Sequence, residues 1–213
     1  MSTDPIRLSV IIGSTREGRL GPTVGDWFTA RATAHGNTEV DVIDLADAEL
    51  PSVHPDWGTE PTPALAALTA RIGAADAFVV VTPEYNHSFP AVLKHFIDLH
   101  REEWQAKPVG FVSYGGAGGG LRAVEQLRLV FAELHCVTVR ETVSFHKVTG
   151  EVFAADGPAH DPEGAAGAAK AMLDQLDWWA HALRTARAAR PYGCPSTRST
   201  HWTLRPCRPA WGR

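Results

Sequence analysis

The 213-residue chain is long enough to bury a sizeable hydrophobic core without disulfide or metal staples, and its length favours one domain. Its 44% hydrophobic and 21% charged residues are ordinary for a globular protein, which excludes the disordered and fibrous classes. A net charge of -4 argues against a nucleic-acid partner, and it is too mild for a strongly acidic electron carrier that docks through surface charge.

Targeting and membrane segments are not evident in the sequence. The first five residues lack the basic and apolar regions of a signal peptide, and no apolar run approaches the roughly 18 to 20 residues that span a bilayer. We therefore expect a cytoplasmic protein without a membrane partner. The odd number and wide spacing of the cysteines argue against a disulfide framework or a CxxC metal site: Cys136, Cys194 and Cys207.

Apolar periodicity predicts strands that alternate with helices along most of the chain. In chain order, we expect strands over 7–12, 38–45, 77–81, 108–113 and 137–143, and between or after them helices over 24–34, 64–74, 89–99, 121–134 and 165–189. This alternation indicates βαβ units and therefore an α/β fold. It predicts a doubly wound, five-stranded parallel sheet in the flavodoxin-like order 2-1-3-4-5, with helices on both faces.

Two of the expected helices are apolar over more than one stripe, those over 89–99 and 121–134. Such helices need apolar cover beyond the sheet on which they pack. At the start of the first one, we expect Ser88 to cap the helix and Pro90 to lie in its first turn.

The composition changes after about residue 190. The segment 191–213 contains four prolines and four arginines, no acidic residue and no apolar periodicity. We therefore divide the chain into a domain over 1–189 and a basic tail over 190–213, which we expect to be extended or disordered. Two alternatives are an arm that docks on a partner subunit through Trp202 and Trp211, and a metal site of Cys194, Cys207 and His201. We expect no metal site.

Three polar loops follow buried strands at the carboxyl edge of the predicted sheet, where open α/β sheets place their ligands. The first loop begins at Gly13, which permits a sharp turn. Hydroxyls, backbone amides and positive charge come from four residues that follow it: Ser14, Thr15, Arg16 and Arg19. Because the loop lacks both the Lys-Ser/Thr of a Walker A loop and the GxGxxG of a dinucleotide site, we expect it to hold a phosphate monoester without a metal. The alternative is a polar turn with incidental arginines.

The second and third loops offer planar and polar groups suited to a flat heterocycle. The second is formed by Pro83, Glu84, Tyr85, Asn86 and His87. The third is formed by Ser113, Tyr114, Gly115 and Gly116, whose glycines let the backbone approach a ring closely. Taken alone, a loop histidine is usually just solvated, and a glycine-rich loop is a weak signal.

The three loops together resemble those of the NADPH-dependent FMN reductase family. The resemblance rests on Gly-Ser-Thr-Arg-x-Gly-Arg after the first strand, Pro-Glu-Tyr-Asn-His-Ser after the third and Ser-Tyr-Gly-Gly after the fourth, and it covers about residues 6 to 185. It implies that the first loop binds the FMN phosphate, the second frames the isoalloxazine edge and the third makes a further ring contact. It also implies a homodimer or a tetramer, in which the two broadly apolar helices supply the interface.

The activity that this resemblance implies is that of an FMN-dependent NAD(P)H oxidoreductase. Hydride passes from NADPH or NADH to FMN and on to a flavin, quinone, azo or similar small-molecule acceptor. The flavin carries this chemistry, so we expect no catalytic side chain of the protein. The alternative is a non-catalytic FMN-binding electron carrier that acts through a protein partner.

Overall fold

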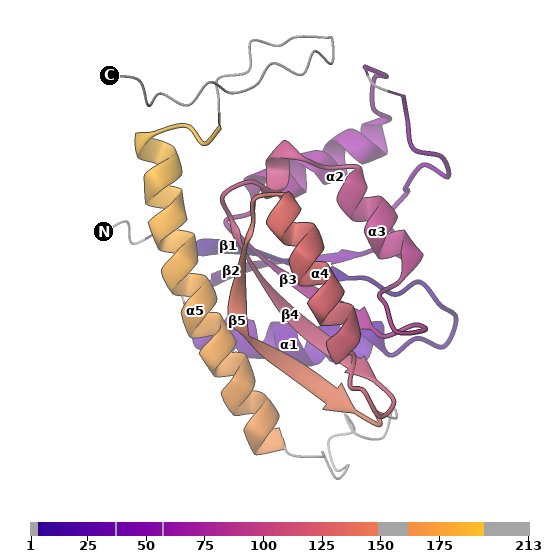
Figure 1. Cartoon of the computed structure of the whole chain (residues 1–213). Helices are drawn as coiled ribbons and strands as arrows, with labels where there is room; N and C mark the ends of the chain where they lie inside the picture. Colours follow the sequence, from indigo (N-terminus) through magenta and orange to yellow (C-terminus); the bar gives the residue numbers. More distant parts are fainter. Residues whose placement is uncertain (1–3, 37, 57, 149–161, 194–213) are drawn as a thin grey trace, which may run out of the picture.

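The computed structural model describes residues 4–36, 38–56, 58–148 and 162–193 (Figure 1). Strands and helices alternate along this part of the chain, as the apolar periodicity predicts. The elements are β1 (Ile6–Ile12), α1 (Gly21–His35), β2 (Thr38–Asp44), α2 (Pro63–Ala74), β3 (Ala77–Pro83), α3 (Ala91–Asp98), a 3-10 turn (Glu102–Trp104), β4 (Pro108–Gly115), α4 (Leu121–Glu133), β5 (Val137–His146) and α5 (Pro162–Ala189).

The five strands form one parallel sheet in the order β2-β1-β3-β4-β5, which confirms the predicted flavodoxin-like arrangement. All five strands run the same way, so their carboxyl ends meet at one edge of the sheet. In the centre of the sheet, Ile12 lies opposite Val81, and Pro83 lies opposite Tyr114. This register aligns the ends of β1, β3 and β4, from which the three polar loops leave.

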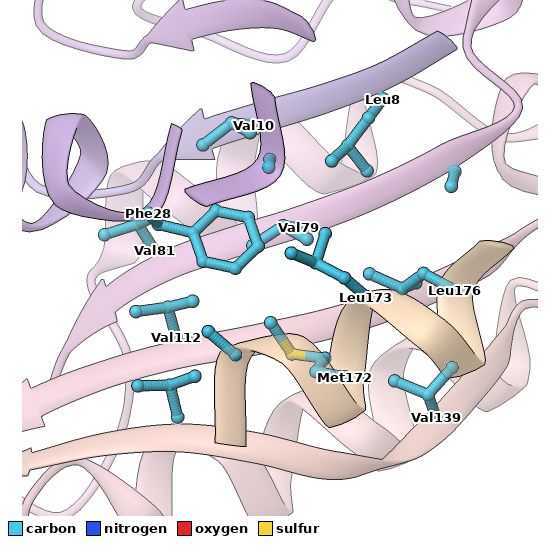
Figure 2. Close-up of a cluster of buried hydrophobic side chains, with 14 of the residues drawn as sticks. Leu8, Val10, Phe28, Val79, Val81, Val112, Val139, Met172, Leu173 and Leu176 are labelled. Carbon is cyan, nitrogen blue, oxygen red and sulfur yellow. The ribbon is translucent and has the colours of Figure 1, made fainter. Parts of the chain in front are cut away.

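Two hydrophobic layers cover the two faces of the sheet. On one face, side chains of α1 and α5, including Phe28 and Met172, pack on Val79 and Val81 of β3 (Figure 2). On the other face, α2, α3 and α4 pack on side chains that include Phe78 and Val80. Because β3 is covered on both faces, all seven of its residues are buried, which explains its continuous apolar run.

The described helix and strand ends correct two expectations. The helix α3 begins at Ala91 after Pro90, and no side chain caps it, so the predicted capping by Ser88 is wrong. The Ser88 hydroxyl instead donates to Gln126 Oε1 at 2.5 Å, on the neighbouring helix α4. The strand β4 continues to Gly115, so Ser113, Tyr114 and Gly115 are strand residues and not part of the loop that follows.

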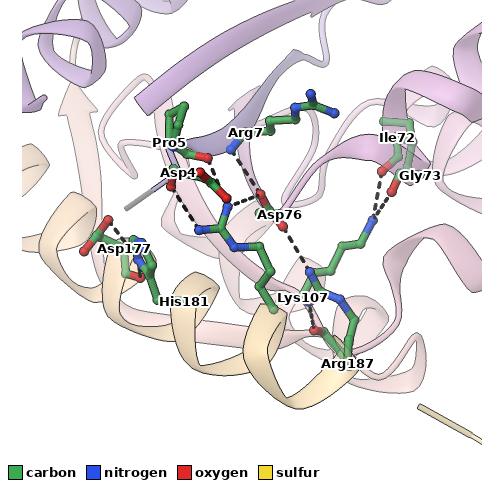
Figure 3. Close-up of polar contacts among 12 residues, drawn as sticks. Asp4, Pro5, Arg7, Ile72, Gly73, Asp76, Lys107, Asp177, His181 and Arg187 are labelled. Carbon is green, nitrogen blue, oxygen red and sulfur yellow. Dashed lines mark hydrogen bonds and ion pairs between the residues drawn. The ribbon is translucent and has the colours of Figure 1, made fainter. Parts of the chain in front are cut away.

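The opposite, amino-terminal edge of the sheet is closed by a network of charged side chains (Figure 3). The Asp76 carboxylate accepts hydrogen bonds from Arg184 and Arg187, which fasten α5 to the loop before β3. Beside it, the buried ammonium group of Lys107 donates to the carbonyl oxygens of Ile72 and Gly73 at the end of α2. This edge therefore has a structural role in holding α5 and α2.

Within the described part of the chain, no helix is both long and apolar enough to cross a membrane. The predicted division into a domain over 1–189 and a tail over 190–213 stays a prediction, because residues 194–213 lie outside the described residues. The alternatives that involve Trp202, Trp211, Cys194, Cys207 and His201 lie outside them too.

Candidate functional site

The structure brings the three polar loops together at the carboxyl edge of the sheet. The Gly13 amide donates to the carbonyl of Val81 at 2.9 Å, and the Glu84 amide donates to the carbonyl of Tyr114 at 3.2 Å. The Ser14 and Tyr85 hydroxyls lie 2.7 Å apart, which links the first loop to the second. The three segments singled out in the sequence therefore form one contiguous site.

The first loop leads into the open amino-terminal end of α1. The helix has no side-chain cap and no acidic residue in its first turn, so the partial positive charge of its amino terminus is not neutralised there. Gly21 lets this end approach β1 closely, because a Cβ at this position would lie 2.8 Å from Ile12 Cγ2. Thr15 and Arg16 are exposed just before this helix. Uncapped amides beside an exposed arginine are a donor set for a phosphate group.

Arg19 has a different environment from Arg16. Its Nη1 donates to Asp44 Oδ1 at 2.6 Å and to the carbonyl oxygen of Ser14 at 3.0 Å. The hydrogen bond to Asp44 raises the pKa of Arg19, and burial opposes this shift. Arg19 thus links the first loop to the end of β2, and its charge is already balanced by the Asp44 carboxylate.

A cluster of three hydroxyl groups lies beneath the loops. Ser14 is fully buried, and its hydroxyl is bound to Tyr85. The buried Tyr114 hydroxyl has no hydrogen-bond partner of good geometry among the described residues, although it lies near Ser14. Burial raises the pKa of Tyr114, and the Ser14 hydroxyl opposes that rise. Tyr114 therefore lies under the first loop, whereas its predicted place was a ring contact of the third loop.

The second loop is a tight hairpin turn. Tyr85 and Ser88 exchange two backbone hydrogen bonds of 2.8 and 3.0 Å across it. At its tip, Asn86 and His87 have φ angles of 49° and 72°, the left-handed pair of a type I′ turn. Asn and His are both among the non-glycine residues that are enriched in this conformation. The tip residues are exposed, so the hairpin presents backbone groups and the His87 ring at the edge of the site.

Helix α4 holds this hairpin through two residues that the sequence analysis missed. Arg122 contacts the Glu84 carboxylate at 3.0 Å and His87 Nδ1 at 3.2 Å. One turn later, Gln126 donates from Nε2 to the carbonyl oxygen of His87 at 2.8 Å and accepts from Ser88. The Glu84 carboxylate is thus bound by Arg122 of α4. Nothing in the sequence marks Arg122 and Gln126 for this role, because α4 also carries Glu125, Arg128 and Glu133.

The third loop is held by side chains beneath it. The carbonyl oxygen of Gly119 accepts hydrogen bonds from both Ser113 and Ser144, each at 2.8 Å. Gly119 must lack a side chain, because a Cβ would lie 2.5 Å from Ser144 Oγ. By contrast, a Cβ at Gly116 would meet no atom within 4 Å, so open space lies beside this part of the loop.

A cavity of about 520 Å³ lies next to the first loop, beyond the end of β2. Its lining includes one arginine, Arg71, and a larger number of acidic residues: Asp26, Asp44, Asp47 and Glu49. An anion such as a phosphate would be repelled there, so we assign the ligand to the three loops and not to this cavity. Among the described residues, no group of His, Cys, Asp and Glu side chains could hold a metal ion.

The site's chemistry fits FMN. The uncapped helix α1 with Thr15 and Arg16 suits a phosphate monoester, and the exposed hairpin tip and the open space at Gly116 leave room for a flat ring. Of the predicted binding residues, Arg16, Thr15, Asn86, His87 and Gly116 face outward or border open space. The side chains of Ser14, Arg19, Glu84, Ser113 and Tyr114 are engaged in or buried under the loops.

Comparison with known proteins gives concordant matches. Residues 6–150 match the model of the family described as NADPH-dependent FMN reductase. An NAD(P)H-dependent FMN reductase of Schizosaccharomyces pombe is 38% identical over 122 residues, 54% of this chain and 60% of that protein. A probable NADPH:quinone oxidoreductase of Oryza sativa is 30% identical over 76% of this chain and 84% of its own length. The NAD(P)H:acceptor oxidoreductase FerB of Paracoccus denitrificans superposes with a TM-score of 0.66 at 23% identity, over 83% of this chain and 98% of FerB.

Proposed function

Because the chain belongs to the NADPH-dependent FMN reductase family, we propose that the three loops at its sheet edge form the FMN site of an NAD(P)H-dependent oxidoreductase. The family supports FMN as cofactor and NAD(P)H as co-substrate, with flavin or quinone compounds as electron acceptors. FMN, when bound, supplies hydride acceptance and release. Bound between these loops, it requires no catalytic acid or base from the protein.

The observation that carries this proposal is the pairing of an uncapped helix end with an exposed arginine. In our assignment, the amides at the start of α1, together with Thr15 and Arg16, bind the FMN phosphate. Ser14 and Arg19 support that loop from below and from the side. Charge on the phosphate is balanced by Arg16, because the charge of Arg19 is already balanced by Asp44.

The second and third loops frame the isoalloxazine ring in this proposal. The hairpin of Pro83, Glu84, Tyr85, Asn86 and His87 lines one edge with backbone groups, and Gly115 and Gly116 let the third loop approach the ring. Ser113 and Tyr114 act from beneath, since both are buried. The hairpin is thus a rigid frame for a planar group, held in place by α4.

Helices α3 and α4 supply the subunit contact of a proposed homodimer. Leu121 and Leu129 of α4 are 44% and 75% exposed, although both are large apolar residues. A second copy of the chain would cover this face, and the hairpin held by α4 would then lie close to the dimer interface. Three further expectations stay predictions: a cytoplasmic location, the absence of a nucleic-acid partner, and assembly beyond a dimer.

The test is an anaerobic titration of FMN-loaded protein with NADPH and, separately, with NADH. We expect the flavin absorbance near its long-wavelength maximum to bleach with at least one nucleotide and to return when a quinone is added. A flavin that stays oxidised with both nucleotides would leave only the electron-carrier alternative.

A further inference from the structure

The further inference concerns the imidazole of His87 in the hairpin of the second loop, and it rests on the proposed function. We propose that Arg122 holds His87 in its neutral Nε2–H tautomer, so that the hairpin presents a neutral hydrogen-bond donor to the carbonyl oxygen of a quinone acceptor. Arg122 is then a positioning residue, and His87 determines which acceptors the site favours.

The tautomer follows from the hydrogen-bonding capacity of arginine. Arg122 Nη1 lies 3.2 Å from His87 Nδ1, within hydrogen-bond distance. A guanidinium group carries only donors, so Nδ1 must be the acceptor and cannot bear a proton. In a neutral imidazole the proton then lies on Nε2, which is the outer nitrogen of the ring.

The contacts of α4 restrict both the ring and the backbone of His87. Gln126 binds the His87 carbonyl oxygen at 2.8 Å, and Arg122 binds the ring one helical turn away. The same guanidinium contacts Glu84 at 3.0 Å, and that side chain is only 10% exposed. The positive charge beside the ring is therefore balanced, and because His87 is exposed, its Nε2–H is available as a preorganised donor without net charge.

Quinone reduction generates charge at a position that such a donor can stabilise. Conversion of a quinone to a hydroquinone requires two electrons and two protons. NAD(P)H supplies two electrons and one proton as a hydride, and solvent supplies the second proton. Until that proton arrives, one quinone oxygen carries negative charge, and a hydrogen bond from His87 Nε2 would lower its energy. Reduction of an acceptor without a carbonyl group generates no oxyanion, so this acceptor should gain much less from the donor.

The first experiment compares two substitutions at His87 with two acceptors. Gln carries its amide N–H near the place of Nε2, whereas Asn carries its amide near the place of Nδ1. Asn also tolerates the φ of 72° better than Gln, so backbone strain alone would favour His87→Asn. The measured quantity is the ratio of kcat/KM for p-benzoquinone to kcat/KM for ferricyanide, which has no carbonyl oxygen.

We expect His87→Asn to lower this ratio about tenfold and His87→Gln to restore most of it. Any change in FMN binding or in reduction by NADPH affects both acceptors, so it does not alter the ratio. An unchanged ratio in His87→Asn would overturn the role assigned to His87.

The second experiment measures the tautomer directly in the FMN-free protein. In ¹⁵N-histidine-labelled protein at pH 8, we expect the His87 signals of an Nε2–H tautomer, assigned by their loss in His87→Asn. Arg122→Met should shift them toward the average of the two tautomers. Arg128→Met, which removes another arginine of α4 whose contacts are the β5 carbonyl oxygens, Glu125 and the Phe111 ring, should leave them unchanged.

The two experiments separate this inference from the proposed function. Protein that does not oxidise NAD(P)H with FMN would refute the proposed function and, with it, the role in quinone reduction, while the tautomer would still be decided. An Nδ1–H tautomer in a protein that does reduce quinones would refute the inference alone.

Discussion

The Arg19 guanidinium lies 2.6 Å from the carboxylate of Asp44, and this ion pair closes the gap between the first loop and the end of β2. Only 17% and 16% of the two side chains are exposed, so the pair is largely shielded from water. The same nitrogen of Arg19 binds the Ser14 carbonyl oxygen. The backbone of the first loop is therefore held by Arg19 in the ligand-free structure.

Asp44→Ala should destabilise the protein, because it leaves a partly buried guanidinium without its counter-charge. We expect the free energy of unfolding in urea to fall by about 1–3 kcal/mol, less than for a fully buried pair. Asp41→Ala is the matched control, since Asp41 lies on the same strand and pairs with Arg71, with both side chains more than 40% exposed. That variant should lose at most about 0.5 kcal/mol, and equal losses would argue against a special role for Asp44.

Arg16→Ala should weaken FMN binding by about 1.5–3 kcal/mol, because it removes a charge-assisted hydrogen bond to the phosphate. Riboflavin, which lacks the phosphate, should bind the variant and the wild type equally. Fluorescence quenching of each flavin on titration with FMN-free protein gives both affinities. Unchanged FMN affinity, or an equal loss for riboflavin, would refute the phosphate role of Arg16.

The local pattern of apolar residues predicted most of the fold. The apolar run of β3 could be read as a buried strand because both faces of that strand are covered. The absence of a cap at Ser88 was not predictable, because the Ser88 hydroxyl binds Gln126, which lies 38 residues further along the chain. Helix ends depend on such distant contacts, whereas helix interiors depend on spacing within the helix.

The positions of the site loops were predictable, but the partners of individual side chains were not. Arg16 and Arg19 look equivalent in the sequence, and only the register of β1 with β2, which aligns Ile12 with Asp44, gives Arg19 a carboxylate. Arg122 was missed for the same reason, since α4 meets the hairpin only in the folded chain.

Tyr114→Phe should raise the stability of the FMN-free protein by about 1 kcal/mol, because it removes a buried hydroxyl that has no hydrogen-bond partner among the described residues. Tyr85→Phe should lower it by about 1 kcal/mol, because it leaves the buried Ser14 hydroxyl without its bond. Thermal and urea unfolding of the two variants measure both changes. If both substitutions raised the stability, or both lowered it, the hydrogen bonding assigned to the Tyr114 and Tyr85 hydroxyls would be wrong.

Lys107 should make stability depend on pH in the alkaline range. Burial lowers the pKa of Lys107 to about 8, although Asp76 opposes this shift. The unfolded chain therefore binds more protons between about pH 8 and the ordinary lysine pKa, and stability should rise with pH across that window.

Lys107→Met isolates this effect. The wild-type free energy of unfolding minus that of the variant should increase by on the order of 2–3 kcal/mol from pH 8 to 10.5. The buried thiol of Cys136, whose pKa burial raises to about 12, is present in both proteins, so its titration largely cancels. A difference that does not vary with pH would show that Lys107 titrates normally in the folded protein.

Leu129→Arg should convert the proposed dimer to a monomer. Leu129 is 75% exposed on α4, where a second chain would bury it, and a charge there would lack a partner in an apolar interface. Val53→Arg is the matched control, because Val53 is 76% exposed but lies in the loop before α2, outside the proposed interface. Sedimentation velocity should show a monomer for Leu129→Arg and a dimer for both the wild type and Val53→Arg. A dimer that survives Leu129→Arg would place the subunit contact on a different face of the molecule.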